Sequence, residues 1–170
     1  MEQAALKKKL HYEPLTGIFT WNDTNKRAGN QHHSGYRRIR FMDKEVREHK
    51  LAWLYMTGHM PTSKEEIDHN NHIRNDNRWT NLNLGTKQDN QKNASKRKDN
   101  TSGCTGVSWN KQKQAWRAYI NTGEEIAHLG CRTEWWDAVC LRKSAETKYG
   151  YHNNHGNNAP TGAGEIRKLD

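Results

Sequence analysis

A basic run in the middle of the chain, residues 92–98, contains almost no apolar side chain. Such a run has too little apolar surface to lie in a core, so we expect a linker or the exposed end of a helix there. Only 32% of the 170 residues are apolar, which is little for one large core but enough for two small ones. We therefore predict two modules, residues 1–98, which include the basic linker, and residues 99–150. Residues 151–170, rich in Asn and Gly, are expected to form a disordered tail.

Positive charge predominates, with 28 Lys and Arg against 19 Asp and Glu and a formal net charge of +9. This excess favours a polyanionic partner. Nucleic acid is a better candidate than a membrane, because the charge is spread along the chain and no run of 18 apolar residues exists. Residues 1–9 also lack the apolar stretch of a signal peptide.

The three cysteines, Cys104, Cys131 and Cys140, form no CxxC pair. Their odd number and spacing argue against a disulfide framework and against a cysteine zinc site. They fit a reducing compartment, so a cytoplasmic protein is expected.

The first module is predicted to be of the α+β class. Alternating polar and apolar side chains predict strands at residues 18–21, 35–41, 45–48, 67–69 and 81–84. The predicted helices are residues 2–12, where Leu6 and Leu10 are four apart, residues 49–56, and a third that begins near Thr86. Gly58 suits the end of the second helix.

The second module is predicted to be a three-stranded antiparallel sheet with one helix. The strands are residues 103–109, 115–121 and 125–129, joined by hairpin turns. Thr133 is expected to cap the helix, and Gly150 suits its C-terminal end. Apolar side chains at steps of three and four form one stripe along this helix, made of Trp135, Ala138, Leu141, Ala145 and Tyr149.

Two neighbours on the strand at residues 67–69, Asp68 and His69, are candidates for catalysis. A carboxylate suits a hard cation such as Mg²⁺, and a histidine suits general-base work on water near neutral pH. Alternation places them on opposite sides of an ideal strand, so one shared site requires the strand to bend or one side chain to reach around its edge. The pair alone is a weak signal, because Asp-His dipeptides are common at surfaces.

The surroundings strengthen this signal. A strand, a polar loop, a strand and a helix follow one another, with polar groups on the first strand and on the helix. This order resembles the ββα-metal motif of HNH endonucleases, and most closely that of phage HNH homing endonucleases. The similarity covers about residues 48–93 and rests on residues 51–53, 67–69, 75–78, 81–82 and 88–90.

The resemblance implies a role for four residues. Asp68 would ligate a divalent metal, and Asn90 would supply the second protein ligand. His69 would activate the attacking water, and Asn81 would hold the His69 ring through its amide oxygen. Asn90 stands where many HNH proteins have histidine, so an oxygen ligand set favours Mg²⁺ or Mn²⁺ over zinc or nickel.

Several assignments leave alternatives open. Asn83 rivals Asn81, because the two are one strand period apart and would face the same way. His72 is a weaker rival ligand and more simply a loop residue. His49 either lies near the metal site and touches DNA or makes a local hydrogen bond at its helix start, and the second interpretation is favoured. Three basic residues also have two interpretations: they either hold the DNA backbone or are solvated surface charges. They are Arg78, Lys87 and Lys92.

The second module resembles an AP2 domain over about residues 100–150. The likeness rests on residues 100–109, 115–120, 128–130 and 148–150. It implies a sheet whose exposed face enters the DNA major groove. Alternation puts Arg117 and Tyr119 on one face and Trp116, Ala118 and Ile120 on the other, so Arg117 and Tyr119 are expected to face DNA.

The hairpin beside these residues adds further DNA-binding candidates, Lys111 and Lys113. Trp109 either contacts DNA or packs on the helix. The alternative for this module is a small protein-interaction fold.

Together these features predict a metal-dependent, site-specific HNH DNA endonuclease of the homing type. We expect it to be phage-encoded, monomeric and active in the cytoplasm of an infected bacterial host, with double-stranded DNA as partner and no membrane or small-molecule cofactor. The alternative is a sequence-specific DNA-binding regulator whose nuclease core is inactive. A nuclease directed at RNA or a general degradative nuclease is a further possibility, although a dedicated DNA reader would then be redundant.

Overall fold

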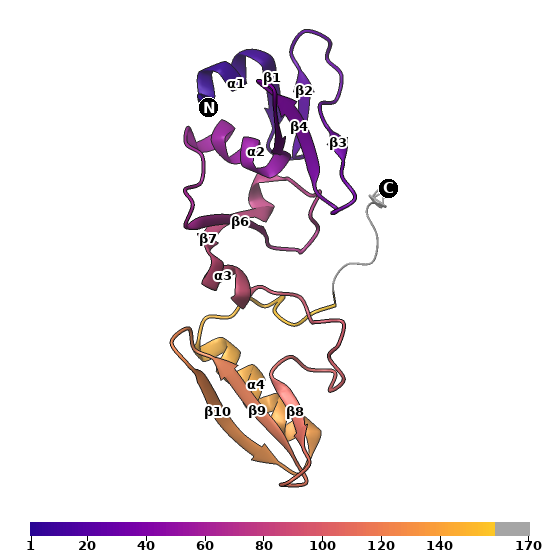
Figure 1. The fold of residues 1–170 in the computed structure, drawn as a ribbon, viewed down its shortest axis with the longest axis vertical. Helices are drawn as coiled ribbons and strands as arrows, with labels where there is room; N and C mark the ends of the chain where they lie inside the picture. Colours follow the sequence, from indigo (N-terminus) through magenta and orange to yellow (C-terminus); the bar gives the residue numbers. More distant parts are fainter. Residues whose placement is uncertain (159–170) are drawn as a thin grey trace. The chain divides into compact units, whose positions relative to one another are not determined.

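The computed structural model describes residues 1–158 and divides the chain into two compact units (Figure 1). The first covers Met1–Lys87, and the second begins at Gln88. The boundary therefore falls at the start of a helix and not after the predicted linker at residue 98. Backbone hydrogen bonds explain why the basic run belongs to the second unit. The Lys96 N–H donates to the Asn157 carbonyl at 2.8 Å, and the Gly156 N–H donates to the Ala94 carbonyl at 2.9 Å.

Short elements make up the first unit. They are α1 Gln3–Lys9, β1 Leu10–Glu13, β2 Ile18–Trp21, β3 Asn30–Gln31, β4 Arg37–Phe41, β5 Lys44–Arg47, α2 Glu48–Thr57, β6 Glu65–His69, the 3₁₀ turn η1 Trp79–Asn81 and β7 Leu82–Thr86. The strands form the antiparallel groups β1-β2, β3-β4-β5 and β6-β7. The mixed α+β character agrees with the sequence prediction.

The N-terminal helix is shorter than predicted. It ends at Lys9, and the next four residues form β1, in which Leu10 pairs with Trp21 of β2. Leu10 and Tyr12 are both buried, at alternate positions of this strand. The spacing of Leu6 and Leu10 predicts a longer helix. Residues 10–13 are extended because they pair with β2, and local propensity does not indicate this pairing.

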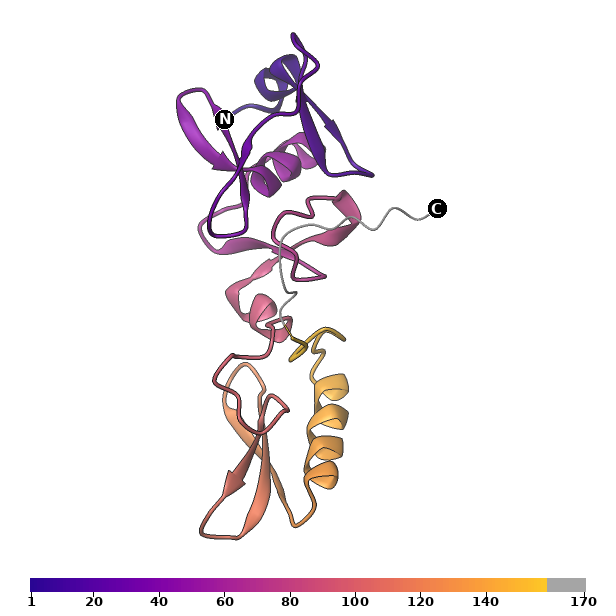
Figure 2. The same ribbon diagram turned by 90° about the vertical axis from the view of Figure 1, so that its right-hand side faces the viewer.

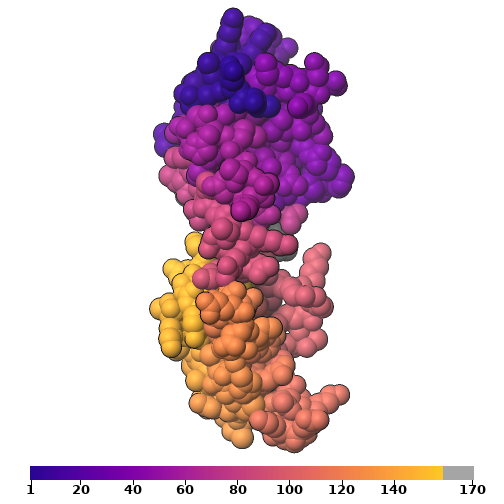
Figure 3. All heavy atoms as spheres, turned by 60° about the vertical axis from the view of Figure 1, so that its left-hand side comes forward, coloured from indigo at the N-terminus to yellow at the C-terminus, as the bar shows by residue number. Residues whose placement is uncertain are grey.

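One hydrophobic core holds the first unit together. Ile39 and Phe41 of β4 point into it, and Arg38 and Arg40 alternate on the other face. The indigo N-terminal residues pack directly against the rest of this unit in the space-filling view (Figure 3). The buried core residues are Leu6, Leu10, Tyr12, Phe19, Ala28, Ile39, Phe41, Leu51, Ala52, Leu54, Ile67 and Leu82.

The β1-β2 hairpin fixes the polar loop at residues 70–78, between β6 and η1. Tyr12 Oη donates to the Asn77 carbonyl at 2.7 Å, and the Trp79 N–H donates to the Pro14 carbonyl at 3.0 Å. Gly17 has a φ of 72°, and a side chain there would collide with the backbone of Asn77. The turn therefore needs glycine both for its backbone conformation and for this close approach.

The second unit begins with α3 Lys87–Lys92, which spans the boundary, and has the predicted three strands and one helix. β8 Val107–Asn110, β9 Ala115–Asn121 and β10 Ile126–Arg132 form an antiparallel sheet in the order β10-β9-β8, and α4 Trp135–Lys148 lies along one face of it (Figure 2). Ala138 of α4 packs with Val107 and Ala118 in a small core. Thr133 is not the helix cap, because Glu134 occupies that position and makes no side-chain capping bond.

The start of the C-terminal tail is folded onto the second unit, contrary to the expectation of disorder. Tyr151 Oη donates to the Asn121 carbonyl at 2.6 Å, and Arg142 Nη2 donates to Nε2 of the buried His155 at 3.1 Å. These contacts hold residues 151–158, whereas the predicted disorder at 159–170 lies outside the described residues. Within residues 1–158, no helix has the length and apolar character that a membrane crossing requires.

Candidate active site

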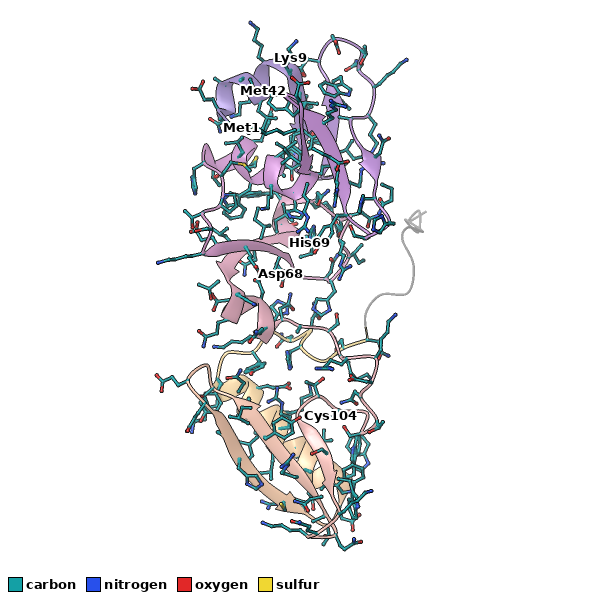
Figure 4. All side chains as sticks on the ribbon, in the orientation of Figure 1. Met1, Lys9, Met42, Asp68, His69 and Cys104 are labelled. Carbon is teal, nitrogen blue, oxygen red and sulfur yellow. The ribbon has the colours of Figure 1, made fainter. Side chains whose placement is uncertain are left out.

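Asp68 and His69 lie next to each other at the end of β6 (Figure 4). His69 is buried, with 3% of its surface exposed, and Asp68 is half-buried. Their side chains leave opposite faces of the strand, as alternation requires. Asp68 Oδ1 nevertheless turns back and accepts a hydrogen bond from the His69 N–H at 2.9 Å. The carboxylate is therefore held close to the histidine backbone.

A chain of hydrogen bonds in the core fixes the His69 ring. His69 Nε2 lies 3.0 Å from Asn77 Oδ1. Asn77 Nδ2 donates to Glu48 Oε2 at 3.1 Å, and Arg37 Nε donates to the same oxygen at 2.8 Å. Glu48 is fully buried at the start of α2, and Asn77 is also buried. These three partners come from β4, α2 and the loop after β6.

This chain determines which ring nitrogen of His69 carries the proton. Because the Asn77 amide nitrogen donates to Glu48, its oxygen faces the ring and can only accept. Nε2 of His69 is therefore protonated, and the basic lone pair is on Nδ1. Burial lowers the pKa of His69, although the bond to Asn77 and the charge of Asp68 act in the opposite direction. The ring is thus neutral near pH 7, the form that a general base needs.

Asn81 does not hold the His69 ring, as the resemblance had implied. It lies in η1 and not in the second strand. Its Oδ1 accepts from the Asn71 N–H at 3.0 Å, and its Nδ2 donates to the Asp76 carbonyl at 2.7 Å. Asn81 thus braces the loop that carries Asn77. The residue that sequence reasoning missed is Asn77, which lies in the segment 75–78 that carries the resemblance but was assigned no role.

Asn83 is not placed to orient His69 either. In the β6-β7 pair, Asn83 is opposite Asp68, and His69 is opposite Leu82. Residues directly opposite each other on paired strands share a face of the sheet. Asn83 therefore lies on the same face as the Asp68 carboxylate and not on that of the buried His69 ring. The expectation that Asn81 and Asn83 face the same way was wrong because the strand begins only at Leu82.

His49 does not have the role that the sequence favoured, which was a local hydrogen bond at the start of its helix. It is buried, and its ring centre lies 5.1 Å from that of His69 and 5.2 Å from that of Tyr36. Burial, followed by the neighbouring His69, Arg47 and Lys50, lowers the pKa of His49 to about 3, so its ring is neutral near pH 7. His72 is a turn residue with a φ of 62°, whose N–H donates to the His69 carbonyl at 2.9 Å.

Oxygen donors predominate among the side chains that could hold a metal near His69. Asp68 offers a carboxylate, and Asn83 places an amide on the same face. In the described part of the chain, no three His, Cys, Asp or Glu side chains are grouped to bind a metal ion. A carboxylate with amides fits Mg²⁺ or Mn²⁺, which retain several water ligands, better than it fits softer metals. Asn90 lies in the part of α3 that belongs to the second unit, so its role as a ligand stays a prediction.

Of the three basic residues proposed to hold DNA in this region, two have protein partners. Arg78 makes a bidentate pair with Asp76, at 2.8 and 2.6 Å. Lys92 Nζ donates to the Tyr149 carbonyl just after α4, at 3.0 Å. Lys87 is exposed. Of the two exposed cations, Arg78 is paired with Asp76, whereas Lys87 has no carboxylate of residues 1–158 within salt-bridge distance.

The sheet of the second unit separates its side chains as predicted. Ala118 and Ile120 are buried, whereas Arg117 is exposed and lies over Tyr119, 5.4 Å from the ring centre. Lys111 and Lys113 are exposed at the β8-β9 turn. Trp109 packs edge-on against Trp116, at 5.2 Å between ring centres, yet 43% of its surface is exposed. Trp109 therefore packs on a side chain of the neighbouring strand β9, and its contact with DNA stays a prediction.

A groove of about 540 Å³ runs along β8 in this unit. Its lining includes Lys111, Trp109 and Tyr119, together with Arg97, which pairs with Asp99 of the same groove at 2.7 Å. Such a combination suits a nucleic acid, because cations attract phosphates and aromatic rings stack on bases.

The comparison with protein families agrees with the geometry around His69. A family model described as HNH endonuclease matches residues 46–92, a range that includes Glu48, Asp68, His69 and Asn77. Comparison with curated proteins and with solved structures gives no significant match. The family match supports an HNH nuclease domain in this part of the chain, with a nucleic acid as its substrate.

Proposed function

We propose that this protein is a metal-dependent, site-specific DNA endonuclease of the HNH type, with His69 as its general base. The observation that carries the proposal is the hydrogen bond between His69 and Asn77, which leaves a neutral imidazole with its lone pair on Nδ1. Both residues lie within residues 46–92, the range that matches the HNH endonuclease model. The homing type and a phage origin are part of the proposal and rest on the sequence resemblance.

Asp68 and Asn90 would hold the metal, Mg²⁺ or Mn²⁺, with Asn83 available beside Asp68 as a further oxygen donor. When bound, a divalent ion supplies charge stabilisation to the phosphate and its leaving oxygen. Asp68 and Asn83 are directly paired across β6 and β7, which supports the use of both as oxygen donors on one face of the sheet.

The chain's own groups would move the proton. His69 takes a proton from water at Nδ1, and the resulting imidazolium keeps its Nε2–H on Asn77. The buried Glu48 carboxylate accepts from the Asn77 amide and therefore keeps the amide oxygen turned toward the ring. This arrangement holds one tautomer and one ring orientation before the substrate arrives, so the base needs no reorganisation.

The second unit would supply affinity for DNA and would fix the position of the protein along the DNA. Arg117 and Tyr119 on the open face of the sheet, with Lys111 and Lys113 at the turn, form a basic and aromatic surface. The AP2-like sequence pattern and the net charge of +9 support double-stranded DNA as its partner. Phosphate contacts would supply affinity, and the sheet would supply the sequence preference.

The test is incubation of the purified protein with supercoiled plasmid libraries in Mg²⁺, Mn²⁺ or EDTA. We expect metal-dependent conversion to open circles or linear DNA, lost in His69→Ala and retained in the matched variant His72→Ala. DNA binding by His69→Ala should remain close to that of the wild type. Cleavage that persists in His69→Ala would disprove the assigned base, and tight binding without cleavage in any metal would favour a DNA-binding regulator.

A further inference from the structure

Two arginines meet on one aromatic ring beside the candidate general base. The guanidinium carbon of Arg47 lies 4.6 Å from the ring centre of Tyr36, and that of Arg74 lies 5.3 Å from it. Arg47 is the last residue of β5, and Arg74 is in the loop after β6. Both side chains are exposed, so the pair is open to solvent.

Neither guanidinium has a neutralising partner. No carboxylate of residues 1–158 lies within salt-bridge distance of Arg47 or Arg74. By contrast, Arg37, Arg38 and Arg78 of the same unit are paired with Glu48, Glu45 and Asp76. Two like charges on one ring repel each other, and the cation–π attraction of each offsets only part of that cost. An anion that contacts both guanidinium groups would offset the repulsion.

The loop structure holds this arrangement in place. Arg74 Nη1 donates to the Ser34 carbonyl at 2.9 Å, which ties the loop after β6 to the turn before β4. Tyr36 packs against His49, at 5.2 Å between ring centres, and His49 is buried. The ring that both cations contact is therefore held by packing against a buried side chain. One of the two arginines, Arg74, is held by a hydrogen bond to a backbone carbonyl.

The pair is also close to the proposed chemistry. The ring centres of Tyr36 and His69 lie 6.0 Å apart. A phosphate bound by the two guanidinium groups would lie in the same part of the first unit as the base. Arginine suits this task, because its planar fork matches the oxygens of a phosphate.

We propose that Arg47 and Arg74, held on the Tyr36 ring, form a binding site for one backbone phosphate of the DNA strand that is cut. This site rests on the proposed function for the identity of the strand, but its affinity for DNA is independent of cleavage. Both guanidinium carbons lie within 5.3 Å of one ring centre and both side chains are exposed, which supports a single phosphate shared by the two arginines. We call this arrangement the Tyr36 site.

The experiment measures binding of the full chain to a 30-base-pair duplex as a function of KCl concentration. It is done in the His69→Ala background with EDTA, so that no cleavage occurs. Loss of one phosphate contact lowers the slope of log K against log salt by about 0.9, which corresponds to about an eightfold loss of affinity at 0.1 M KCl. We expect this change in Arg47→Gln and in Arg74→Gln. The double variant should lose little more than either single one, because the phosphate is shared.

Arg40→Gln is the matched control. Arg40 is an exposed arginine on β4 of the same unit, and within residues 1–158 it lies over no aromatic ring. It should change the slope by much less than 0.9. Arg47→Lys keeps the charge and should keep the slope. Thermal unfolding of each variant shows whether the fold is retained, and these side chains are exposed, so their replacement should leave it intact.

An unchanged slope in both single variants would overturn the Tyr36 site. A double variant whose loss is the sum of the two single losses would overturn the shared phosphate. The nuclease proposal is judged separately, by plasmid cleavage of the wild type. Reduced slopes in the variants without cleavage by the wild type would support the phosphate site and reject the nuclease. Cleavage by the wild type with unchanged slopes in the variants would support the nuclease and reject the phosphate site.

Discussion

Asn77 Nδ2 donates to Glu48 Oε2 at 3.1 Å, and this bond connects the loop after β6 to the first residue of α2. The other end of the Asn77 amide accepts from His69. A buried carboxylate therefore sets the direction of the amide and, through it, the tautomer of the proposed base. The stability of the first unit therefore depends on the charge of Glu48, a carboxylate that is fully buried.

Glu48→Ala should strongly destabilise the first unit. It would leave the Arg37 guanidinium, which is 12% exposed, without its carboxylate partner. Removing one partner of a buried ion pair costs about 3–5 kcal/mol. The measurement is urea unfolding followed by circular dichroism. The control is Glu45→Ala, which breaks the exposed pair with Arg38 and should cost less than about 1 kcal/mol. Equal losses in the two variants would contradict a buried ion pair.

Asn77→Ala should release the His69 ring and lower the cleavage rate by about 100-fold, because a positioned general base contributes at least that much. The ¹⁵N shifts of the His69 ring in an NMR spectrum should change from the Nε2–H form to a mixture of tautomers. Asn81→Ala provides the comparison, since Asn81 bonds only backbone groups of the loop. It should leave the tautomer unchanged, and a mixture there would show that Asn81 acts on the ring after all.

Acid should destabilise the first unit through His49. Its pKa is lowered by burial to about 3 in the folded state, against 6.5 in an unfolded chain. Below pH 6.5 the unfolded chain binds the extra proton, so stability is fully present above that pH and is lost as the pH falls. At pH 5 the loss attributable to His49 is about 2 kcal/mol. The free energies of unfolding of wild type and His49→Gln should therefore diverge in slope between pH 7.5 and 5, and parallel curves would refute a buried neutral His49.

The metal preference should follow the oxygen donors. Cleavage should occur in Mg²⁺ and Mn²⁺ and stop in EDTA. Asn90→His would replace an amide oxygen with a nitrogen ligand, so activity in Mg²⁺ should fall and activity in Ni²⁺ or Zn²⁺ should rise. Cleavage assays with each metal test this, with Asn93→His as the control on the same segment. An unchanged metal profile in Asn90→His would remove Asn90 from the ligand set.

His155→Ala should destabilise the second unit. The buried His155 accepts from Arg142 at 3.1 Å and packs against Tyr151. Loss of a buried hydrogen-bond partner costs about 1–3 kcal/mol. Thermal unfolding of His155→Ala and of His152→Ala, whose side chain is exposed, gives the comparison. Similar midpoints for both variants would mean that residues 151–158 add nothing to this unit.

The sequence by itself determined the features that depend on neighbouring residues. Alternation placed Arg117 and Tyr119 opposite Ala118 and Ile120 in β9, and Gly58 ends α2 in the left-handed conformation that glycine favours. The pattern around Asp68 and His69 was also enough to indicate an HNH domain, because its elements follow one another within 47 residues, 46–92.

Only the tertiary structure decided which side chains meet at His69. Asn77 and Glu48 are 29 residues apart in sequence, and Tyr12 and Asn77 are 65 apart, so no local spacing signals either contact. The same holds for β1, whose strand conformation depends on pairing with β2, and for residues 151–158, which depend on Arg142 and Asn121. Local propensity fixes how a segment is built, whereas the partners of a buried polar group are set by long-range packing, which must satisfy each such group.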